Sequence, residues 1–349
     1  MNPPDSHSEN NKHNNGQGSD ARQGAQFSYQ DLAKNLSMGK LFLLGLISIA
    51  LCSFAPLSFF ASVPMSVAIL LYGRQKSLIL GASLLLISSY MASVFPPLVY
   101  LPFIYFGSLV LGVLNSEVIF RKWHPMKGIS LYGVFAVLVI FLLVGLLIIS
   151  SDQSVQQFSQ SYVDGLFLKL REQNAELLQA GGEQARYLED LLNNSKQVGE
   201  DIVKMAPAMI FVVTFFSLWA SLFLVLRNDL IWKLKHAYPY GINDLIRFKA
   251  PDFFLFPLIG GLALTLLGDI VGDGFFVLGQ NILYGVGVFY FFQGFGVYIQ
   301  FLDFARIFGF LRTLLVMMML LFAFRLIVLI GIFDVWVNFP KYFKKMRQD

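Results

Sequence analysis

The sequence contains little charge and almost no cysteine. Charged residues make up 14% of its 349 residues, whereas soluble domains contain about 25%. Hydrophobic residues make up 56%. This composition excludes an ordinary soluble domain and indicates a polytopic membrane protein. The single cysteine, Cys52, excludes an intrachain disulfide and a cysteine-based metal cluster.

Catalytic and cofactor motifs are also absent. The four histidines are split between the polar N-terminal region and two basic loops, so the sequence predicts no metal site. It contains no HExxH, no GxSxG and no glycine-rich phosphate loop ending in Gly-Lys-Ser/Thr. We therefore expect a protein that is not an enzyme and holds no cofactor. The net charge of +4 comes from Lys and Arg at the ends of apolar runs, which indicates a lipid bilayer and no nucleic acid as the partner.

Many apolar runs reach the roughly 20 residues that a bilayer-spanning helix requires. The sequence predicts an all-α integral membrane protein with eight or nine transmembrane or re-entrant helices. The first run, 41–73, is too long for one span and contains Pro56 and Pro64, which favours two short helices. The later spans are expected at 77–94, 98–120, 129–149, 205–226, 253–267, 275–301 and 313–333.

Composition divides the chain into five regions. The N-terminal region is too polar to form a core and is expected to be disordered, with an interfacial helix at 27–40. The expected regions are a cytoplasmic tail at 1–40, a first membrane half at 41–150, a water-exposed acidic insertion at 151–204, a second membrane half at 205–333 and a basic tail at 334–349.

The acidic insertion determines the predicted topology. Residues 152–203 carry nine acidic side chains against four basic ones, and Gly181-Gly182 divides them into two halves typical of a helical hairpin. Basic residues cluster instead at 121–127 and 227–249, one span away on either side. The positive-inside bias therefore places the hairpin outside and the N-terminus in the cytoplasm. A membrane or periplasmic protein partner is a further expectation for 152–203.

The side of the basic C-terminal tail stays open. Nine crossings would place that tail outside, against the positive-inside bias. Either the tail lies flat at the interface or one segment is re-entrant. The short segment 253–267, which contains Pro257 and Gly260-Gly261, is the expected re-entrant segment.

Ionisable groups inside apolar spans are costly unless they are paired or hydrated. Arg325 lies inside the 313–333 run, and Asp269, Asp273 and Asn281 border the same outer side. One interpretation is an outward-facing pocket for a small anionic or zwitterionic ligand. The alternative is a structural ion pair that joins two helices.

A second polar stripe runs along the C-terminal part of the 275–301 span and just beyond it, with its residues one or two helical turns apart. Gln293, Gln300 and Asp303 share one face of that helix. The stripe is either polar packing between helices or a path for a substrate. Glycines in the same span, among them Gly287, Gly294 and Gly296, are expected to let neighbouring helices approach closely.

Several stretches resemble the YybS-like family of bacterial membrane proteins. They are PAMIFVVTFFSLWASLFLVLRN from Pro207, NILYGVGVFYFFQG from Asn281 and GIFDVWVNFPK from Gly331. The resemblance covers most of 41–345 and implies a bacterial inner-membrane protein. The expected helix arrangement is also similar to that of the substrate-binding membrane subunits of energy-coupling-factor transporters and of the rod-shape protein MreD. The Ala-xxx-Ala pattern of those subunits is absent here, because Ala50 and Ala55 are five residues apart.

Three functions follow as hypotheses, and the third, an intramembrane enzyme, lacks every nucleophile, base and metal pattern considered above. The first is binding, or help in translocation, of a small solute, which polar groups at membrane depth favour. The second is an envelope scaffold whose external hairpin docks a partner protein, which the size of the acidic insertion favours.

Overall fold

The computed structural model describes residues 37–95, 98–150 and 155–345, and these residues form helices and connecting turns without a strand. The predicted disordered tail and most of the predicted interfacial helix lie outside the described residues. The all-α class is confirmed for the part that is described.

The first half contains α2 (Met38–Ser53), the 3₁₀ turn η1 (Ala55–Phe60), α3 (Ser62–Tyr72), α4 (Arg74–Val94), α5 (Leu101–Phe120) and α6 (Pro125–Ser150). The predicted break in the first apolar run is confirmed, because Pro56 lies in η1 between two short helices. Small polar side chains join these helices. The hydroxyl of Ser48 donates to the backbone oxygen of Ala61 at 2.6 Å, and that of Ser66 donates to Gly112 at 3.2 Å.

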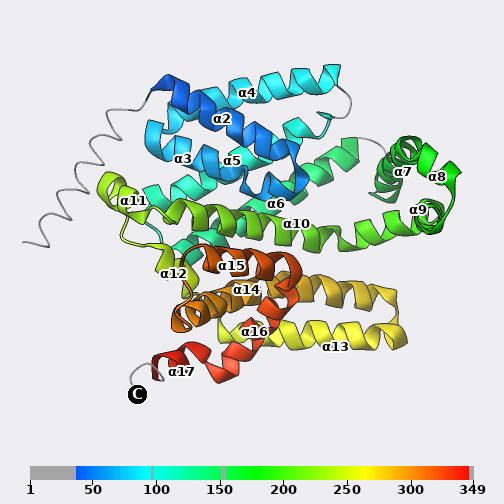
Figure 1. Cartoon of the computed structure of the whole chain (residues 1–349). Coiled ribbons are helices and arrows are strands. Elements are labelled where there is room, and N and C mark those ends of the chain that lie inside the picture. The colour runs from blue at the N-terminus through cyan, green and yellow to red at the C-terminus, as the bar shows by residue number, and fades with distance from the viewer. Residues whose placement is uncertain (1–36, 96–97, 151–154, 346–349) are drawn as a thin grey trace, which may run out of the picture.

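The acidic insertion folds into α7 (Val155–Gln173), α8 (Ala175–Ala180), α9 (Glu183–Asn193) and the first turns of α10 (Ser195–Leu226). The chain turns at Gly181 and Gly182, whose φ angles of 68° and 104° favour glycine. Figure 1 shows these helices gathered at one end of the bundle, with α7 and α9 lying across the direction of α10. The insertion is thus a small helical cluster rather than a two-helix hairpin.

The second half continues with α11 (Asp229–His236), α12 (Ile242–Ile246), η3 (Asp252–Phe254), α13 (Leu255–Val271), α14 (Asp273–Phe304), α15 (Gly309–Phe322), α16 (Phe324–Val337) and α17 (Phe339–Lys345). Its core is aromatic and lies where α10 meets α14. Trp219 stacks on Phe292 with ring centroids 5.0 Å apart, and Phe215 meets Phe289 edge to face at 5.3 Å.

Five of the described helices, α4, α5, α6, α10 and α14, are long and apolar enough to cross a membrane, or six spans if α15 and α16 together form one. Judged by helix length and hydropathy, the described helices give fewer spans than the expected eight or nine. The segments α2, η1–α3 and η3–α13 are apolar but shorter. The expected re-entrant segment 253–267 forms most of α13, which packs along α14 where Gly261 meets the backbone of Gly279.

The span expected at 313–333 is divided in the structure between α15 and α16. The chain bends by 92° between α15 and α16. The start of α15 and the helix that follows α16 both lie near the C-terminal end of α14: Arg312 of α15 pairs with Asp303 at 2.7 Å, and the Phe343 ring of α17 lies 5.5 Å from that of Phe304. The pair therefore enters the bundle and returns to the same end, which brings the C-terminal region beside the other basic loops.

The basic loops of both halves meet at this end of the bundle. Arg74 pairs with Glu117 at 2.6 Å, and Lys235 donates to the backbone oxygen of Leu71. His236 contacts the backbone oxygen of Leu70 through Nε2 at 3.0 Å. Burial lowers the pKa of the Lys235 ammonium and of the His236 imidazole. We call this end the basic end and the end that carries α7–α9 the acidic end.

Candidate functional site: a polar pocket at the basic end

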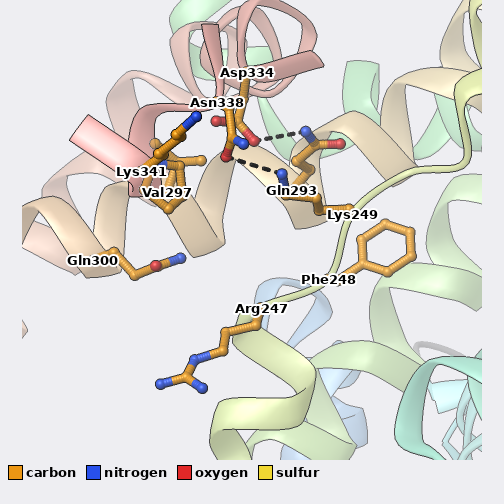
Figure 2. Close-up of a pocket in the computed structure, with 10 residues that line it drawn as sticks. Arg247, Phe248, Lys249, Gln293, Val297, Gln300, Asp334, Asn338 and Lys341 are labelled. Atoms are coloured by element: carbon orange, nitrogen blue, oxygen red, sulfur yellow. Dashed lines mark hydrogen bonds between the residues drawn. The ribbon is translucent and has the colours of Figure 1, made fainter. Parts of the chain in front are cut away.

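A pocket of about 300 Å³ opens between the segment before α13, the C-terminal half of α14 and the junction of α16 with α17. Seven of its ten lining residues are polar, in contrast to the apolar helices around it. The lining residues are Arg247, Phe248, Lys249, Gln293, Val297, Gln300, Asp334, Asn338, Pro340 and Lys341. Figure 2 shows Arg247 across the open space from Asp334 and Asn338.

One wall of the pocket is a buried hydrogen-bond network. The side chain of Gln293, 2% exposed, donates through Nε2 to Oδ2 of Asp334 at 2.8 Å and accepts from the backbone N–H of Ala250 at 2.9 Å. The backbone N–H of Phe339 donates to Oδ1 of Asp334 at 2.8 Å. Both oxygens of a carboxylate that is 2% exposed are thus satisfied by neutral donors.

Two glycines make this network possible by letting backbones touch. A Cβ at Gly294 would overlap the backbone oxygen of Ile327, and a Cβ at Gly331 would overlap that of Tyr290. These two glycines set the crossing of α14 and α16 and so place Asp334 beside Gln293. The close approach predicted for Gly294 is confirmed. It does not occur at Gly287, where a Cβ would meet nothing within 4 Å.

Cations surround the rest of the pocket. Arg247, Lys249 and Lys341 are lining residues, whereas Asp334 is the one carboxylate among the lining side chains. The ammonium of Lys249 donates to Oδ1 of Asn338 at 3.0 Å. Asn338 adopts a left-handed conformation with φ of 52° and ends α16, which turns its amide toward the pocket. The pocket therefore carries an excess of positive charge and suits an anion.

The predicted polar stripe divides in the structure. Gln293 and Gln300 both line the pocket, and Nε2 of Gln300 donates to its own helix at the backbone oxygen of Gly296, 3.1 Å away. Asp303 lies beyond the pocket lining and pairs with Arg312. Two of the three stripe residues thus share one site.

The predicted outer cluster of Arg325, Asp269, Asp273 and Asn281 is not joined by contacts between the side chains that the structure describes. Arg325 and Asp273 are exposed, and neither makes a hydrogen bond or ion pair with Asn281. The side chain of Asp269 lies outside the described residues.

Asn281 instead contacts the backbone of α10 next to Pro207. Its Oδ1 accepts from the N–H of Ala208 at 2.8 Å, and its Nδ2 donates to the oxygen of Lys204 at 2.9 Å. These two backbone groups would bond to one another in an undisturbed helix. Asn281 therefore supports a helix that an internal proline disturbs.

Sequence reasoning missed most of the residues that complete the pocket. They are Arg247, Lys249, Asp334, Asn338 and Lys341. A signal was present, because Asp334 is a carboxylate close to an apolar run and such groups are costly unless they are paired. Its partners could not be named from the sequence, since they approach only when α16 folds back against α14.

A family model described as "Predicted membrane protein (DUF2232)" matches residues 41–335. The chain belongs to this DUF2232 family. The match covers both membrane halves and seven of the ten lining residues, whereas Asn338, Pro340 and Lys341 lie beyond it. No curated protein and no solved structure matches the chain. Membership confirms a membrane protein, whereas the YybS-like name stays a prediction.

Proposed function

We propose that this DUF2232 protein is a non-enzymatic membrane protein that binds a small anionic solute in the pocket at its basic end and helps to move it. The observation that carries the proposal is the charge of the pocket. Arg247, Lys249 and Lys341 line it, and the two oxygens of Asp334 are already occupied by Gln293 and Phe339. The cations therefore have no lining carboxylate free to neutralise them.

The size and shape of the pocket favour a small ligand. A volume of about 300 Å³ is at the lower end of the roughly 300–1,000 Å³ of ligand pockets. The planar guanidinium of Arg247 suits a carboxylate or phosphate group, which it can bind through two parallel N–H donors. The amide of Gln300 and the side chain of Lys341 supply further donors around the same space.

The distribution of charge favours a pocket that opens toward the cytoplasm. The basic end gathers lysines and arginines from the loops of both halves, and short loops rich in Lys and Arg remain on the cytoplasmic side. In this orientation the N-terminus is cytoplasmic, and the acidic end faces outward in a bacterial inner membrane. An anion would then be loaded from, or released to, the cytoplasm.

A ligand titration of the full chain tests the proposal. We would reconstitute it in nanodiscs of uncharged phosphatidylcholine and follow thermal unfolding against inorganic phosphate, sulfate and acetate, with chloride at equal ionic strength as reference. Binding to the folded state alone raises the unfolding temperature with ligand concentration. At least one anion should do so beyond chloride.

Two variants locate the effect. Arg247→Gln should weaken binding about tenfold, the loss of one charge-assisted hydrogen bond of about 1.5 kcal/mol. Lys76→Gln removes an exposed lysine outside the pocket and should leave binding unchanged. Equal unfolding temperatures in all four salts, or equal weakening by both variants, would contradict the proposal.

The scaffold hypothesis keeps one specific observation in its favour. A groove of about 250 Å³ on the acidic insertion is lined by Asp164, Phe167, Leu168, Arg171 and Leu192. Three of its five lining residues are apolar although the region is polar, and Leu168 is 61% exposed. Deleting residues 157–196 separates the hypotheses, because it should remove partner docking but leave the anion titration of the pocket unchanged.

A further inference from the structure

A second cluster of cations lies at the basic end, on the opposite half of the molecule from the pocket. Its centre is Trp123, in the loop between α5 and α6. The guanidinium carbon of Arg121 lies 5.3 Å from the centroid of the indole ring, and Nζ of Lys127 lies 5.7 Å from it. Both distances are within the roughly 6 Å of a cation–π interaction. Two positive charges thus lie beside the same indole ring.

The loop that carries this ring is fixed in place. Trp123 stacks on Tyr132 of α6 with centroids 5.4 Å apart, and its backbone oxygen accepts from the hydroxyl of Tyr238 at 2.9 Å. Trp123 is half-buried, whereas Arg121 and Lys127 are exposed. The cations are therefore positioned by the fold and still open to a ligand.

Acidic side chains do not neutralise the cluster. Glu117 pairs with Arg74 at 2.6 Å and more distantly with Arg121 at 3.4 Å. Lys127 makes no ion pair with a carboxylate in the part of the chain that the structure describes. Lys122 adds a further exposed positive charge next to Trp123. A net positive charge remains beside the indole ring.

Lys127 also begins an exposed apolar face of α6. Side chains three or four residues apart share one face of a helix, and from Lys127 onward these positions are apolar and exposed. They are Leu131 at 51%, Val134 at 49%, Leu138 at 62% and Leu142 at 64%. The face from Lys127 to Leu142 is about 22 Å long at 1.5 Å per residue. That exceeds the roughly 15 Å of hydrocarbon in one leaflet.

We propose that this cluster binds the headgroup phosphate of an anionic phospholipid, with the acyl chains lying along the apolar face of α6. The order of groups along the protein matches the order of groups along a lipid. Arg121 and Lys127 face the phosphate, Trp123 lies at the level of the headgroup, and Leu131 begins the hydrocarbon region. The positive end of α6 at Pro125 adds to the attraction for an anion.

A lipid titration tests the proposal. The full chain in detergent is titrated with phosphatidylglycerol and with phosphatidylcholine of the same short chain length, and bound lipids are counted by native mass spectrometry. We expect phosphatidylglycerol to bind about 25-fold more tightly, because each of two cations contributes about fivefold. The double variant Arg121→Gln/Lys127→Gln should lose most of this preference and keep only the part that Lys122 and the end of α6 contribute.

Two further variants keep the test decisive. Lys127→Gln alone leaves the Glu117 ion pairs intact and should reduce the preference about fivefold, even if the double variant does not fold. Lys233→Gln removes a lysine that pairs with Asp229 at 2.7 Å and is not one of the two cations over the Trp123 ring, and it should keep the full preference. Equal binding of both lipids by the unmodified chain, or a full preference in the double variant, would overturn the proposal.

Inorganic phosphate distinguishes a lipid from a free anion. At millimolar concentration it should not displace phosphatidylglycerol, since it lacks acyl chains to bury on α6. Complete displacement at that concentration would overturn the assignment to lipid.

Discussion

Asn281 and Gln293 lie on the same helix, α14, about 18 Å apart along its axis, and both carry a carboxamide into an apolar environment. Asn281 uses its amide on the backbone of α10 beside Pro207. Gln293 uses its amide on Asp334 and Ala250, at the wall of a pocket lined by cations. A polar side chain in a membrane helix therefore indicates a required partner, and only the identity of that partner distinguishes helix repair from a binding site.

The largest effect is expected from a substitution that disrupts the surroundings of Gln293 and leaves those of Asn281 unchanged. Gly331→Leu places a side chain where the backbone of α14 already lies, so it should separate α16 from α14. Overpacking costs about 1–3 kcal/mol and occasionally more, and a clash with backbone belongs at the upper end, so the anion site should be lost with it. Chemical denaturation and the anion titration measure both effects. Gly287→Ala, which adds a Cβ to open space on α14, is the matched control and should change neither.

The next effect concerns the buried carboxylate. Asp334→Ala leaves Nε2 of Gln293 and the N–H of Phe339 without their acceptors. Unsatisfied buried groups of this kind cost about 1–3 kcal/mol each. Asp334→Asn keeps an acceptor oxygen and should lose less. If the two variants were equally stable in a denaturant titration, Asp334 would not be the acceptor that holds this wall together.

A smaller effect is expected at Asn281, the other carboxamide of α14. Asn281→Ala should reduce the free energy of unfolding by about 1 kcal/mol and leave anion binding intact. In a Pro207→Ala background the N–H of Ala208 can bond within its own helix, so the same substitution should cost less. A double-mutant cycle measures this coupling, and strictly additive effects would contradict the assigned role.

The smallest effect is expected at Arg325. Its side chain is exposed and makes no contact with Asp273 or Asn281 in the described part of the chain. Arg325→Met should therefore change stability by less than about 0.5 kcal/mol and leave the anion titration unchanged. A loss of anion affinity in this variant would favour the outer cluster of Arg325 with Asp269, Asp273 and Asn281 as the binding site instead.

The features that could be predicted from the sequence are those that depend on one or two neighbouring residues. The break at Pro56, the turn at Gly181-Gly182 and the close packing at Gly294 each follow from the chemistry of one residue. The bend between α15 and α16 could not be predicted, because residues 313–330 contain neither proline nor glycine. The same bend brings Asp334 and Asn338 to α14.

The site was predicted in part for the same reason. Gln293 and Gln300 share a helical face, which spacing alone reveals. Arg247 and Lys341 join them only through tertiary contacts across more than 40 residues of chain. In the sequence these two cations are indistinguishable from others that set topology.

The measurement that tests the account most directly is the anion titration of three proteins side by side: the unmodified chain, Arg247→Gln and Asn281→Ala. We predict that Arg247→Gln weakens binding about tenfold at unchanged stability without ligand, whereas Asn281→Ala lowers stability at unchanged affinity. Binding that is lost in Asn281→Ala and retained in Arg247→Gln would contradict the assignment of the site to the basic end of α14.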